Sequence, residues 1–279
     1  MFKQNLNVYF KASSGIGYKL PIYPDVSFSQ VFSEGTIEQK TLHNPENLIS
    51  DGFTSVLNVG NFSFTAPVMD STAFSTLLSI MFETPVKSHT LVVENEGSYI
   101  QYNSVVFTEI VFNINKNQIT TISVSGNFSH SEKVFESAMT NTDLGEVYTY
   151  IEGIGVNIDG LDIERINGFS IEIKNGVNWL ENKTVHDTGP VHKTQFITSD
   201  RVISGNIVQY DDMANPSYND NSPMLVQIKS SGVIFLEFEF PKIINTTRNQ
   251  LDLLNKKGID YRVTDNNKNQ IRIRGVNIL

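Results

Sequence analysis

The sequence predicts a mainly β protein made of two related halves in tandem. Apolar and polar residues alternate along several stretches, of which residues 26–32 are a clear example, and a period of two is typical of half-buried strands. Helical spacing of apolar residues is clearest at one place, residues 70–82. The third observation concerns the whole chain, because residues 26–43 recur in altered form from residue 169 onward.

The repeat begins with two aligned stretches. Residues 26–28 (Val-Ser-Phe) align with residues 169–171 (Phe-Ser-Ile), and residues 37–43 (IEQKTLH) align with residues 180–186 (LENKTVH). In the second alignment Glu, Lys, Thr and His are identical, and the other positions keep apolar for apolar and amide for amide. An internal repeat of this kind indicates a duplicated structural unit, so it affects the interpretation of the whole chain.

Further echoes occur in the same order along the chain. They are Gly-Ile-Gly at 15–17 and 153–155, where we expect turns, Gly-Asn at 60–61 and 205–206, and Asn-Lys-Asn-Gln-Ile at 115–119 and 267–271, where we expect hairpin turns. The sequence therefore predicts a duplication with two domains, residues 1–140 and 141–279, and a boundary near Asn141.

The first half is expected to contain strands on either side of one helix. The predicted strands are 8–11, 26–32, 36–43, 55–65 and two hairpins over 91–127, with Ser33-Glu34-Gly35 as a turn. The helix over 70–82 has capping oxygens at Asp70, Ser71 and Thr72. Its apolar face, expected to pack on a sheet, consists of Phe74, Leu77, Leu78, Met81 and Phe82.

The second half departs from the first in its helix. A polar loop over 211–216 takes the place of the first helix, and a separate helix is predicted between Thr246 and Gly258. Leu251 and Leu254 would share one face of that helix, and Gly258 would be its C-cap residue.

Each half also contains a long arm between two strands, residues 36–52 and residues 179–199. Such arms exceed ordinary hairpin connections, and long surface segments often contact other molecules. Trp179 suits a subunit contact or a place in its own core. The candidate inter-subunit or inter-ring contacts are Ile37, Glu38, Lys40, His43, Trp179, Leu180, Glu181, Lys183 and His186.

Composition narrows the functional classes. The chain has 279 residues, enough for a sizeable core, and a formal net charge of -9 from 21 basic and 30 acidic residues. This balance argues against a surface that grips nucleic acid. With no cysteine, disulfides and thiolate chemistry are excluded. No apolar run has the length of a signal peptide or of a membrane helix, so we expect no membrane binding by this chain.

Candidate chemical sites are weak. The five histidines have no metal-ligand spacing, even where His186 and His192 flank a Gly-Pro interruption. Asp211-Asp212 and Asn219-Asp220-Asn221 lack the order of a calcium loop. Glu237 and Glu239 lie on one face of a strand and could form a glycosidase pair, as could Glu172 with Glu181, but exposed faces commonly carry such carboxylates. We expect no cofactor, no metal and no enzymatic activity.

One segment resembles a known family. Residues 60–65 (Gly-Asn-Phe-Ser-Phe-Thr) form a strand that runs into the helix over 70–82, and this pattern resembles the core of tailed-bacteriophage tail tube proteins. The tandem copy resembles the duplicated tail tube proteins, or major tail proteins, of some siphophages. The likeness of pattern extends over nearly the whole chain, but the helix signature matches only in the first half.

The resemblance implies a β-sandwich or barrel with one packed helix per domain, and two tandem tail-tube-like domains that form rings. Three chains would supply six domains and imitate a hexamer. The implied function is a structural tube subunit of the virion, assembled in the host cytoplasm, whose rings stack with one another and contact other tail proteins. DNA would pass through an acidic lumen without specific binding, because carboxylates repel phosphates.

Two alternatives remain at this stage. A tail hub, terminator or tube-initiator ring could be built from the same domains. A carbohydrate-binding or adhesive β-sandwich protein belongs to another class, and it would need an exposed aromatic platform. The single tryptophan and the scattered tyrosines do not favour such a platform.

Overall fold

The structure is a computed structural model. It describes residues 6–12, 17–41, 44–134, 142–147, 151–180, 191–210, 221–250, 256–264, 269–273 and 275–279. For residues 32–41, 44–57, 70, 146–147, 191–192, 247–250 and 256–257 the description covers the backbone only.

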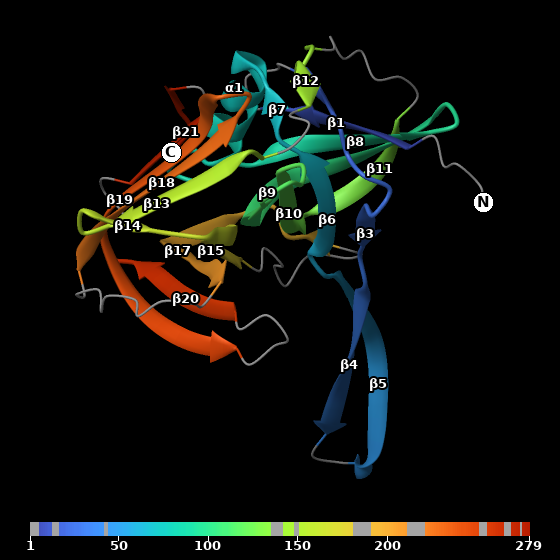
Figure 1. The fold of residues 1–279 in the computed structure, drawn as a ribbon. Coiled ribbons are helices and arrows are strands. Elements are labelled where there is room, and N and C mark those ends of the chain that lie inside the picture. Colours follow the sequence, from blue (N-terminus) through green and yellow to red (C-terminus); the bar gives the residue numbers. More distant parts are fainter. Residues whose placement is uncertain are drawn as a thin grey trace.

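The predicted mainly β fold is confirmed (Figure 1). The first half contains β1 (Leu6–Lys11), β2 (Gly17–Leu20), β3 (Ser27–Ser29), β4 (Phe32–Thr41), β5 (Asn44–Leu57), β6 (Gly60–Pro67), β7 (Met69–Asp70), α1 (Thr72–Met81), β8 (His89–Asn95), β9 (Ser98–Asn115), β10 (Thr121–Phe128) and β11 (His130–Val134). The second half contains β12 (Glu146–Val147), β13 (Gly153–Ile158), β14 (Leu161–Ile163), β15 (Ile166–Trp179), β16 (Val191–His192), β17 (Phe196–Tyr210), β18 (Ser222–Ser230), β19 (Val233–Gln250), β20 (Lys256–Val263), β21 (Gln270–Ile273) and β22 (Val276–Asn277).

The long strand β9 belongs to both layers of the first half. Its first part pairs with β8 and β11, and β8 also pairs with β1. Its second part pairs with β10, which pairs with β6, and β6 pairs with β3. The pairing of β10 with β9 shifts register between Ser125 and Gly126, close to the point where β9 passes from one layer to the other. Such irregularities bend a strand.

The second half has the same order of pairing around β19. The first part of β19 pairs with β18 and β21, and β18 also pairs with β13. The second part pairs with β20, which pairs with β17, and β17 pairs with β15. Both β9 and β19 are 18 residues long.

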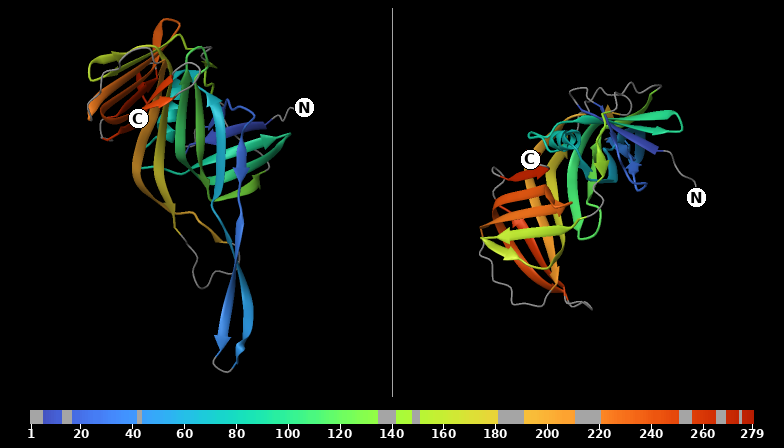
Figure 2. Two further views of the ribbon diagram at one scale, coloured as in Figure 1. Left: turned by 60° about the horizontal axis from the view of Figure 1, so that its bottom comes forward. Right: turned by 45° about the horizontal axis from the view of Figure 1, so that its top comes forward.

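One sheet continues from the first half into the second, because β9 also pairs antiparallel with β15. We call the run β3–β6–β10–β9–β15–β17–β20–β19 the shared sheet. Several of its strands lie side by side in Figure 2, left. Its apolar side forms the core with the outer layers of both halves. For example, the Phe169 ring of β15 lies 5.2 Å from the Phe238 ring of β19, and Phe112 of β9 lies 5.6 Å from the same ring.

The predicted first helix is confirmed as α1. Ser71 is its N-cap residue, and the Ser71 Oγ accepts a hydrogen bond of 3.0 Å from the Phe74 amide. All five predicted apolar side chains of this helix are buried. The helix contacts β21 and β22, so an element of the first half packs on the end of the second.

Several expectations about the second half are wrong. Residues 246–250 belong to strand β19 and 256–258 to strand β20, so the predicted helix is wrong at both ends, and Leu251 and Leu254 lie outside the described residues. In the described residues α1 is the only helix, so the packed helix that the structure describes belongs to the first half. The spacing of apolar residues in this segment indicated a helix. Instead, residues Ile243 to Gln250 of β19 pair with β20, and this ladder satisfies backbone groups that a helix would have used.

Three expected turns also differ. Residues 33–35 lie inside β4, and Gly153-Ile154-Gly155 begins strand β13. The Asn-Lys-Asn-Gln-Ile echo falls at unequal places, because residues 115–119 connect β9 to β10 whereas Gln270 and Ile271 begin β21. This echo is therefore no marker of equivalent hairpins.

The first arm is a β-hairpin of β4 and β5 that projects from the body of the molecule (Figures 1 and 2). Near its root, β5 pairs in parallel with the short strand β16, with Val191 opposite Val56 and His192 opposite Leu57. A segment of the second arm therefore lies against the base of the first.

Candidate functional site: the seam and the sheet edges

The seam is the place where the two halves join, and we define it as the pairing of β9 with β15. Its register runs from Gly168 opposite Asn115 to Lys174 opposite Glu109. Because this ladder is continuous with those on either side, the two halves form one hydrogen-bonded sheet.

An ion cluster crosses the seam. The Lys174 Nζ lies 2.8 Å from the Glu172 Oε1 on its own strand and 3.3 Å from the Glu109 Oε1 on β9. Hydrogen bonding to Glu172, with a further contribution from Glu109, raises the pKa of Lys174 above its ordinary value. The Lys174 side chain is about half exposed, so solvent screens this cluster and it contributes more to register than to stability.

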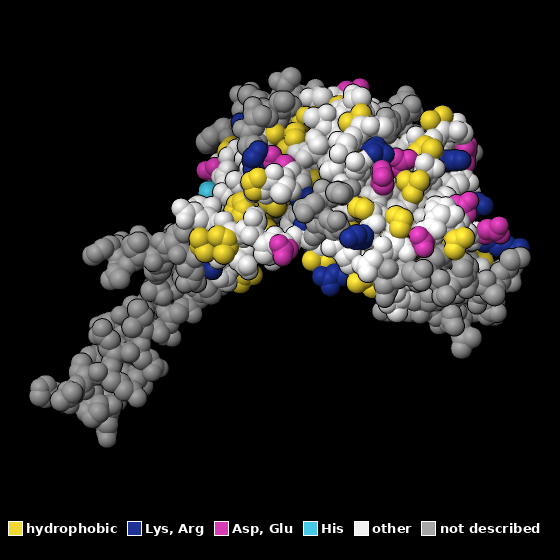
Figure 3. Space-filling view, turned by 90° about the vertical axis from the view of Figure 1, so that its left-hand side faces the viewer, with side chains coloured by type: hydrophobic (Ala, Val, Ile, Leu, Met, Phe, Trp, Pro, Cys, Tyr) yellow, Lys and Arg dark blue, Asp and Glu magenta, His cyan; other side chains and the backbone are white. Residues whose placement is uncertain are grey.

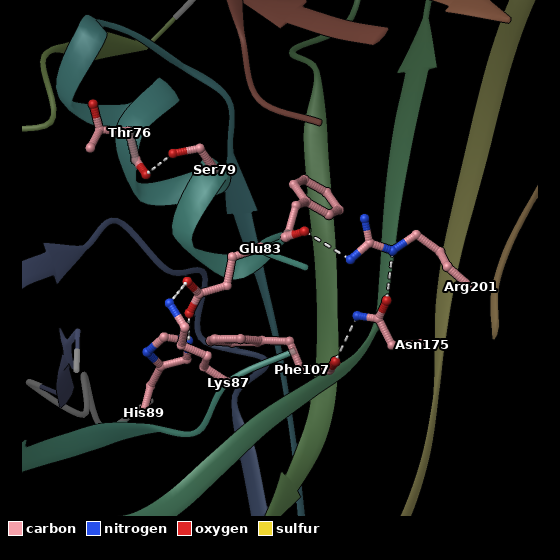
Figure 4. Close-up of polar contacts among 9 residues, drawn as sticks. Thr76, Ser79, Glu83, Lys87, His89, Phe107, Asn175 and Arg201 are labelled. Atoms are coloured by element: carbon pink, nitrogen blue, oxygen red, sulfur yellow. Dashed lines mark hydrogen bonds and ion pairs between the residues drawn. The ribbon is translucent and has the colours of Figure 1, made fainter. Parts of the chain in front are cut away.

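A second polar contact crosses the seam on the core side (Figure 4). Arg201 of β17 donates from its Nε to the Asn175 Oδ1 at 2.8 Å and from its Nη2 to the Phe82 carbonyl at 2.8 Å. The Asn175 Nδ2 donates to the Phe107 carbonyl at 3.0 Å. Two residues of the second half thus bind the end of α1 and the middle of β9, and burial lowers the pKa of Arg201.

The other side of the shared sheet is polar. The pairing places small hydroxyl and amide side chains there in neighbouring rows: Ser27, Ser29, Asn61, Ser63, Thr65, Asn113, Ser123, Ser125, Asn127, Ser170, Ser204 and Asn206. Many of them bond across strands, as in Ser27 to Ser63 at 2.8 Å and Asn127 to Asn61 at 2.7 Å. We call this surface the polar face.

Charges on the polar face are few and of both signs. Glu109, Glu172 and Asp260 stand beside Lys174 and Arg262 on the paired strands. The carboxylates have neighbours, since the Asn206 Nδ2 donates to the Asp260 Oδ1 at 2.7 Å and Lys174 binds both glutamates. The face carries few charges on β3, β6, β9, β10 and β15, and β17, β20 and β19 continue it. Asp25, just before β3, lines the same pocket as Glu109 and Ser125, so acidic side chains outnumber basic ones among these residues.

The shared sheet has two edges. Among the described residues, β3 pairs with β6 alone, and the second part of β19 pairs with β20 alone. Two apolar side chains lie at these edges: Val31 is 65% exposed just after β3, and Ile244 is 43% exposed on β19. Open strand edges invite pairing with another chain, and soluble proteins usually protect them.

The predicted arm residues are separated by the structure. Ile37, Glu38 and Lys40 lie on β4, where the backbone alone is described. Trp179 ends β15 and packs on Phe196 at 5.3 Å, and Leu180 follows it with 39% exposure. The remaining predicted residues, His43, Glu181, Lys183 and His186, lie outside the described residues.

Chemical sites receive no support from the described part of the chain. It holds no cluster of three or more metal-ligating side chains. Glu237 and Glu239 are ion-paired with Arg272, whose Nη1 lies 2.6 Å from the Glu237 Oε1 and whose Nη2 lies 3.3 Å from the Glu239 Oε2. These carboxylates connect β19 to β21. On the face seen in Figure 3, acidic and basic side chains are interspersed and form no basic patch.

The fold and the seam define a β-sheet structural protein whose distinctive features are strand edges and a projecting hairpin. Residues 11–276 match the model of the Bacteriophage Baseplate Tube Protein Family. The chain therefore belongs to this family, and it is a structural protein of the phage tail or baseplate and a component of the virion. No curated protein sequence matches it significantly. Within the described residues, no helix has the length and apolar character required to cross a bilayer.

Sequence reasoning missed the seam. Glu109, Lys174, Asn175 and Arg201 have no local pattern that marks them, because their role follows from a pairing between distant strands. The alternation of Ser123, Ser125 and Asn127 with apolar residues was the one readable signal, since it marks a strand with a polar, uncharged outer side.

Proposed function

We propose that this protein is a subunit of the phage tube in which three copies close a ring of pseudo-sixfold symmetry around a channel for DNA. Each copy supplies two domains, residues 1–140 and residues 141–279, that arose by duplication. The ring stacks on other rings or on neighbouring tail proteins, and the subunit has a structural role without catalysis. Assembly takes place in the host cytoplasm.

The observation that carries the proposal is the seam itself. β15 is the first strand of the four-strand run β15–β17–β20–β19, as β3 is of β3–β6–β10–β9. The seam joins the last strand of one run to the first strand of the next. The same junction between β19 of one copy and β3 of another would extend the sheet from chain to chain. Closure of the ring would leave no open edge in the shared sheet.

The equal order of pairing supports the duplication. The hairpins β8–β9 and β18–β19 both turn on two residues with positive φ, Glu96-Gly97 and Ser231-Gly232. This turn type matches the twist of antiparallel strands and favours Gly at its second position. Two halves with the same strand order and the same turn are expected from a copied domain.

The polar face would line the channel, because the opposite side of the shared sheet is occupied by the core. Several of its hydroxyl and amide groups are bonded to one another, and it carries few cationic side chains. DNA binds proteins chiefly through phosphate contacts with Lys and Arg. A wall with few cations and an excess of carboxylates would let the duplex pass without holding it.

The family description favours a place in the baseplate part of the tube, and copy number tests this. A single ring contributes three chains to a particle, whereas a tube protein repeated along the tail contributes many. The arm of β4 and β5 would bridge neighbouring subunits or rings, because it projects beyond the body of its own chain (Figure 1).

Electron microscopy of the purified protein, combined with mass measurement in solution, tests the ring. The expected particle contains three chains and shows six similar lobes around a central hole. A particle that remains monomeric at all concentrations and salt conditions would overturn the proposal. Rings with a number of lobes other than six would overturn the pseudo-sixfold arrangement.

A further inference from the structure

We infer that the shared sheet continues from one copy to the next in a single register, in which Thr246 of β19 lies opposite Val31 of the following copy. This inference rests on the proposed ring, and it adds the register and the residues of the contact between copies. The occupant of each open edge is a second copy of this chain, because the seam within the chain already joins the last strand of one run to the first strand of the next.

Two rows of paired residues fix which positions of the two halves correspond. Both rows start from aligned residues, since residues 26–28 match residues 169–171. The row across β3, β6, β10 and β9 consists of Ser27, Ser63, Ser125 and Glu109. The row across β15, β17, β20 and β19 consists of Ser170, Asn206, Asp260 and Thr246. Thr246 therefore occupies the place in β19 that Glu109 occupies in β9.

The change of layer in each long strand supports this correspondence. β9 pairs with β8 up to Val105 and with β10 from Val106 onward. β19 pairs with β18 up to Ile243 and with β20 from the same residue onward. Counted from the first residue paired in the shared sheet, Val106 or Ile243, both Glu109 and Thr246 lie three residues further along the strand.

Val31 corresponds to Lys174 by the same alignment. Ser27 matches Ser170, and Val31 and Lys174 each lie four residues further along the chain. Both are exposed, and strand alternation places each on the same face as the serine from which the count starts. Lys174 lies opposite Glu109 within the chain, so the equivalent register between copies places Val31 opposite Thr246.

The rest of the contact follows from this pair. An antiparallel ladder in this register runs from Ser27 opposite Gln250 to Val31 opposite Thr246. One step further along the same face, Ile244 lies beside Ser33, where the first arm of the next copy leaves the sheet. Ile244 is 43% exposed in the single chain, and the root of that arm would cover it. The ladder would also pair the backbone groups that both edges leave open.

The pair between copies differs in chemistry from the pair within the chain. Glu109 and Lys174 are charged, and their Oε1 and Nζ atoms lie 3.3 Å apart. Val31 and Thr246 are uncharged and β-branched, and Val31 is 65% exposed in the single chain. Residues of this shape favour strands and pair well across them. An uncharged pair also leaves no ion to be buried without a partner when two copies meet.

Disulfide trapping tests the register, and the chain suits it because it contains no cysteine. Residues directly opposite one another on antiparallel strands have Cα atoms roughly 4.5–5.5 Å apart, within reach of a disulfide. The double variant Val31→Cys with Thr246→Cys is purified, assembled and oxidised, and its products are separated on a denaturing gel without reductant. We expect covalent dimers and closed trimers. Each single variant should remain almost entirely monomeric on the same gel.

Three matched variants control for geometry. Val31→Cys with Ile244→Cys and Val31→Cys with Arg248→Cys shift the register by two residues in opposite directions, or roughly 7 Å along a strand. Each should give at least tenfold less trimer than the Val31–Thr246 pair. Glu109→Cys with Lys174→Cys places the pair at the seam within the chain, so its disulfide should join no two chains.

A transfer of charge tests the same register without cysteine. Val31→Lys with Thr246→Glu recreates between copies the pair that Lys174 and Glu109 form within the chain. Both positions are exposed in the single chain, so folding should be preserved. We expect the double variant to form rings at a protein concentration at least fivefold lower than either single variant, because each single variant leaves one charge without its partner at the edge.

The outcomes separate the register from the ring on which it rests. Covalent trimers of Val31→Cys with Thr246→Cys from six-lobed rings support the inferred register. Six-lobed rings in which a shifted pair cross-links better, or in which the charged double variant assembles no better than the single variants, overturn the register and leave the ring in place. If the wild type forms no rings under any condition, both the ring and the register are wrong.

Discussion

Glycines beneath aromatic rings fix the close packing of the shared sheet. Gly60 lies under Phe128 and Gly126 under Phe62 in the pair β6–β10, and Gly205 lies under Tyr261 in the pair β17–β20. A methyl group at these positions would occupy space that the ring already fills. Both halves therefore contain a glycine that leaves room for an aromatic ring on the neighbouring strand.

Gly126→Ala should destabilise the protein by roughly 1–3 kcal/mol, because overpacking forces side chains and backbone apart. The new Cβ would overlap the Val106 carbonyl and lie 2.6 Å from a ring carbon of Phe62. Urea unfolding followed by tryptophan fluorescence measures the loss. Gly155→Ala is the matched control, since its Cβ would meet the Gln227 carbonyl at an ordinary 3.7 Å. Equal losses in both variants would contradict the argument.

Arg201→Met should also reduce the free energy of unfolding, by about 1–3 kcal/mol, because the Phe82 carbonyl and the Asn175 Oδ1 lose their donor. Methionine keeps much of the length of the side chain, so the loss reports on polar contacts. Arg262→Met on exposed β20 is the control and should change stability little. A stability of Arg201→Met equal to that of the control would show that the contact does not hold the halves together.

The burial of His89 predicts that the folded protein loses stability in mild acid. Its side chain is 1% exposed, packs 5.0 Å from the Phe10 ring and lies beside Glu83 and Lys87. Burial lowers the pKa of His89 below its ordinary 6.5, with Glu83 opposing this shift. The unfolded chain then binds the proton more readily than the folded chain, so stability falls as pH drops below about 6.5.

The comparison of His89→Phe with the wild type between pH 7.5 and pH 5.5 isolates this effect. The melting temperature of the wild type should fall more steeply with acidification than that of the variant, because phenylalanine has no proton to bind. His130→Phe, at a half-buried position, is the control for a general histidine effect. Parallel curves for wild type and His89→Phe would mean that other groups account for the acid sensitivity.

At the scale of elements, the sequence predicted what local patterns determine. The α1 helix was predicted with its cap because Ser71 and the apolar spacing from Phe74 to Phe82 act within one turn or two. The false helix at 246–258 failed because its local signals, Leu251, Leu254 and Gly258, carry no record of the ladder that joins β19 to β20. Tertiary pairing decides such ambiguous stretches.

The seam was beyond local prediction for the same reason. Glu109 and Lys174 are brought opposite one another by the pairing of β9 and β15, and neither strand's sequence indicates its neighbour. The arms were predicted as long segments between strands, because both halves contain such a segment in sequence. The geometry of the first arm was not predicted, because strand β4 continues through Ser33-Glu34-Gly35, which has the composition of a turn.

Removal of the first arm tests the role of this element. Thr36 and Phe53 are opposite one another on β4 and β5, so residues 36–53 can be replaced by Asn-Gly, a pair that favours tight hairpin turns. The body should keep its melting temperature within about 2 °C, because a surface hairpin contributes little to the core. Rings should form without stacking if the arm bridges rings, and electron microscopy reads the result. Stacking by the shortened chain would contradict this role.

At the scale of the whole molecule, the two halves differ less in their strands than in what is attached to them. Both have the same order of pairing, yet only the first has a described helix, and that helix contacts β21 and β22 of the second half. A chain with two different halves can make a different contact with each half, whereas six identical subunits all make the same contacts. In the proposed ring, this division makes the contact between chains separable from the contact within a chain.

Ile244→Asp tests that separation. A carboxylate at the edge of β19 should block pairing with a second copy, since strand edges with charges resist extension of a sheet. Folding should be preserved, because Ile244 is 43% exposed in the single chain and its removal opens no cavity. Sedimentation and circular dichroism should therefore show a folded monomer under conditions in which the proposal expects rings of the wild type.

Leu161→Asp provides the matched control, because Leu161 is a similarly exposed apolar residue at 47% but lies on β14, away from both edges of the shared sheet. It should assemble like the wild type. Loss of rings in both variants would show that general surface apolarity drives association. Rings formed by Ile244→Asp would show that the chains contact one another at a surface other than the edge of β19.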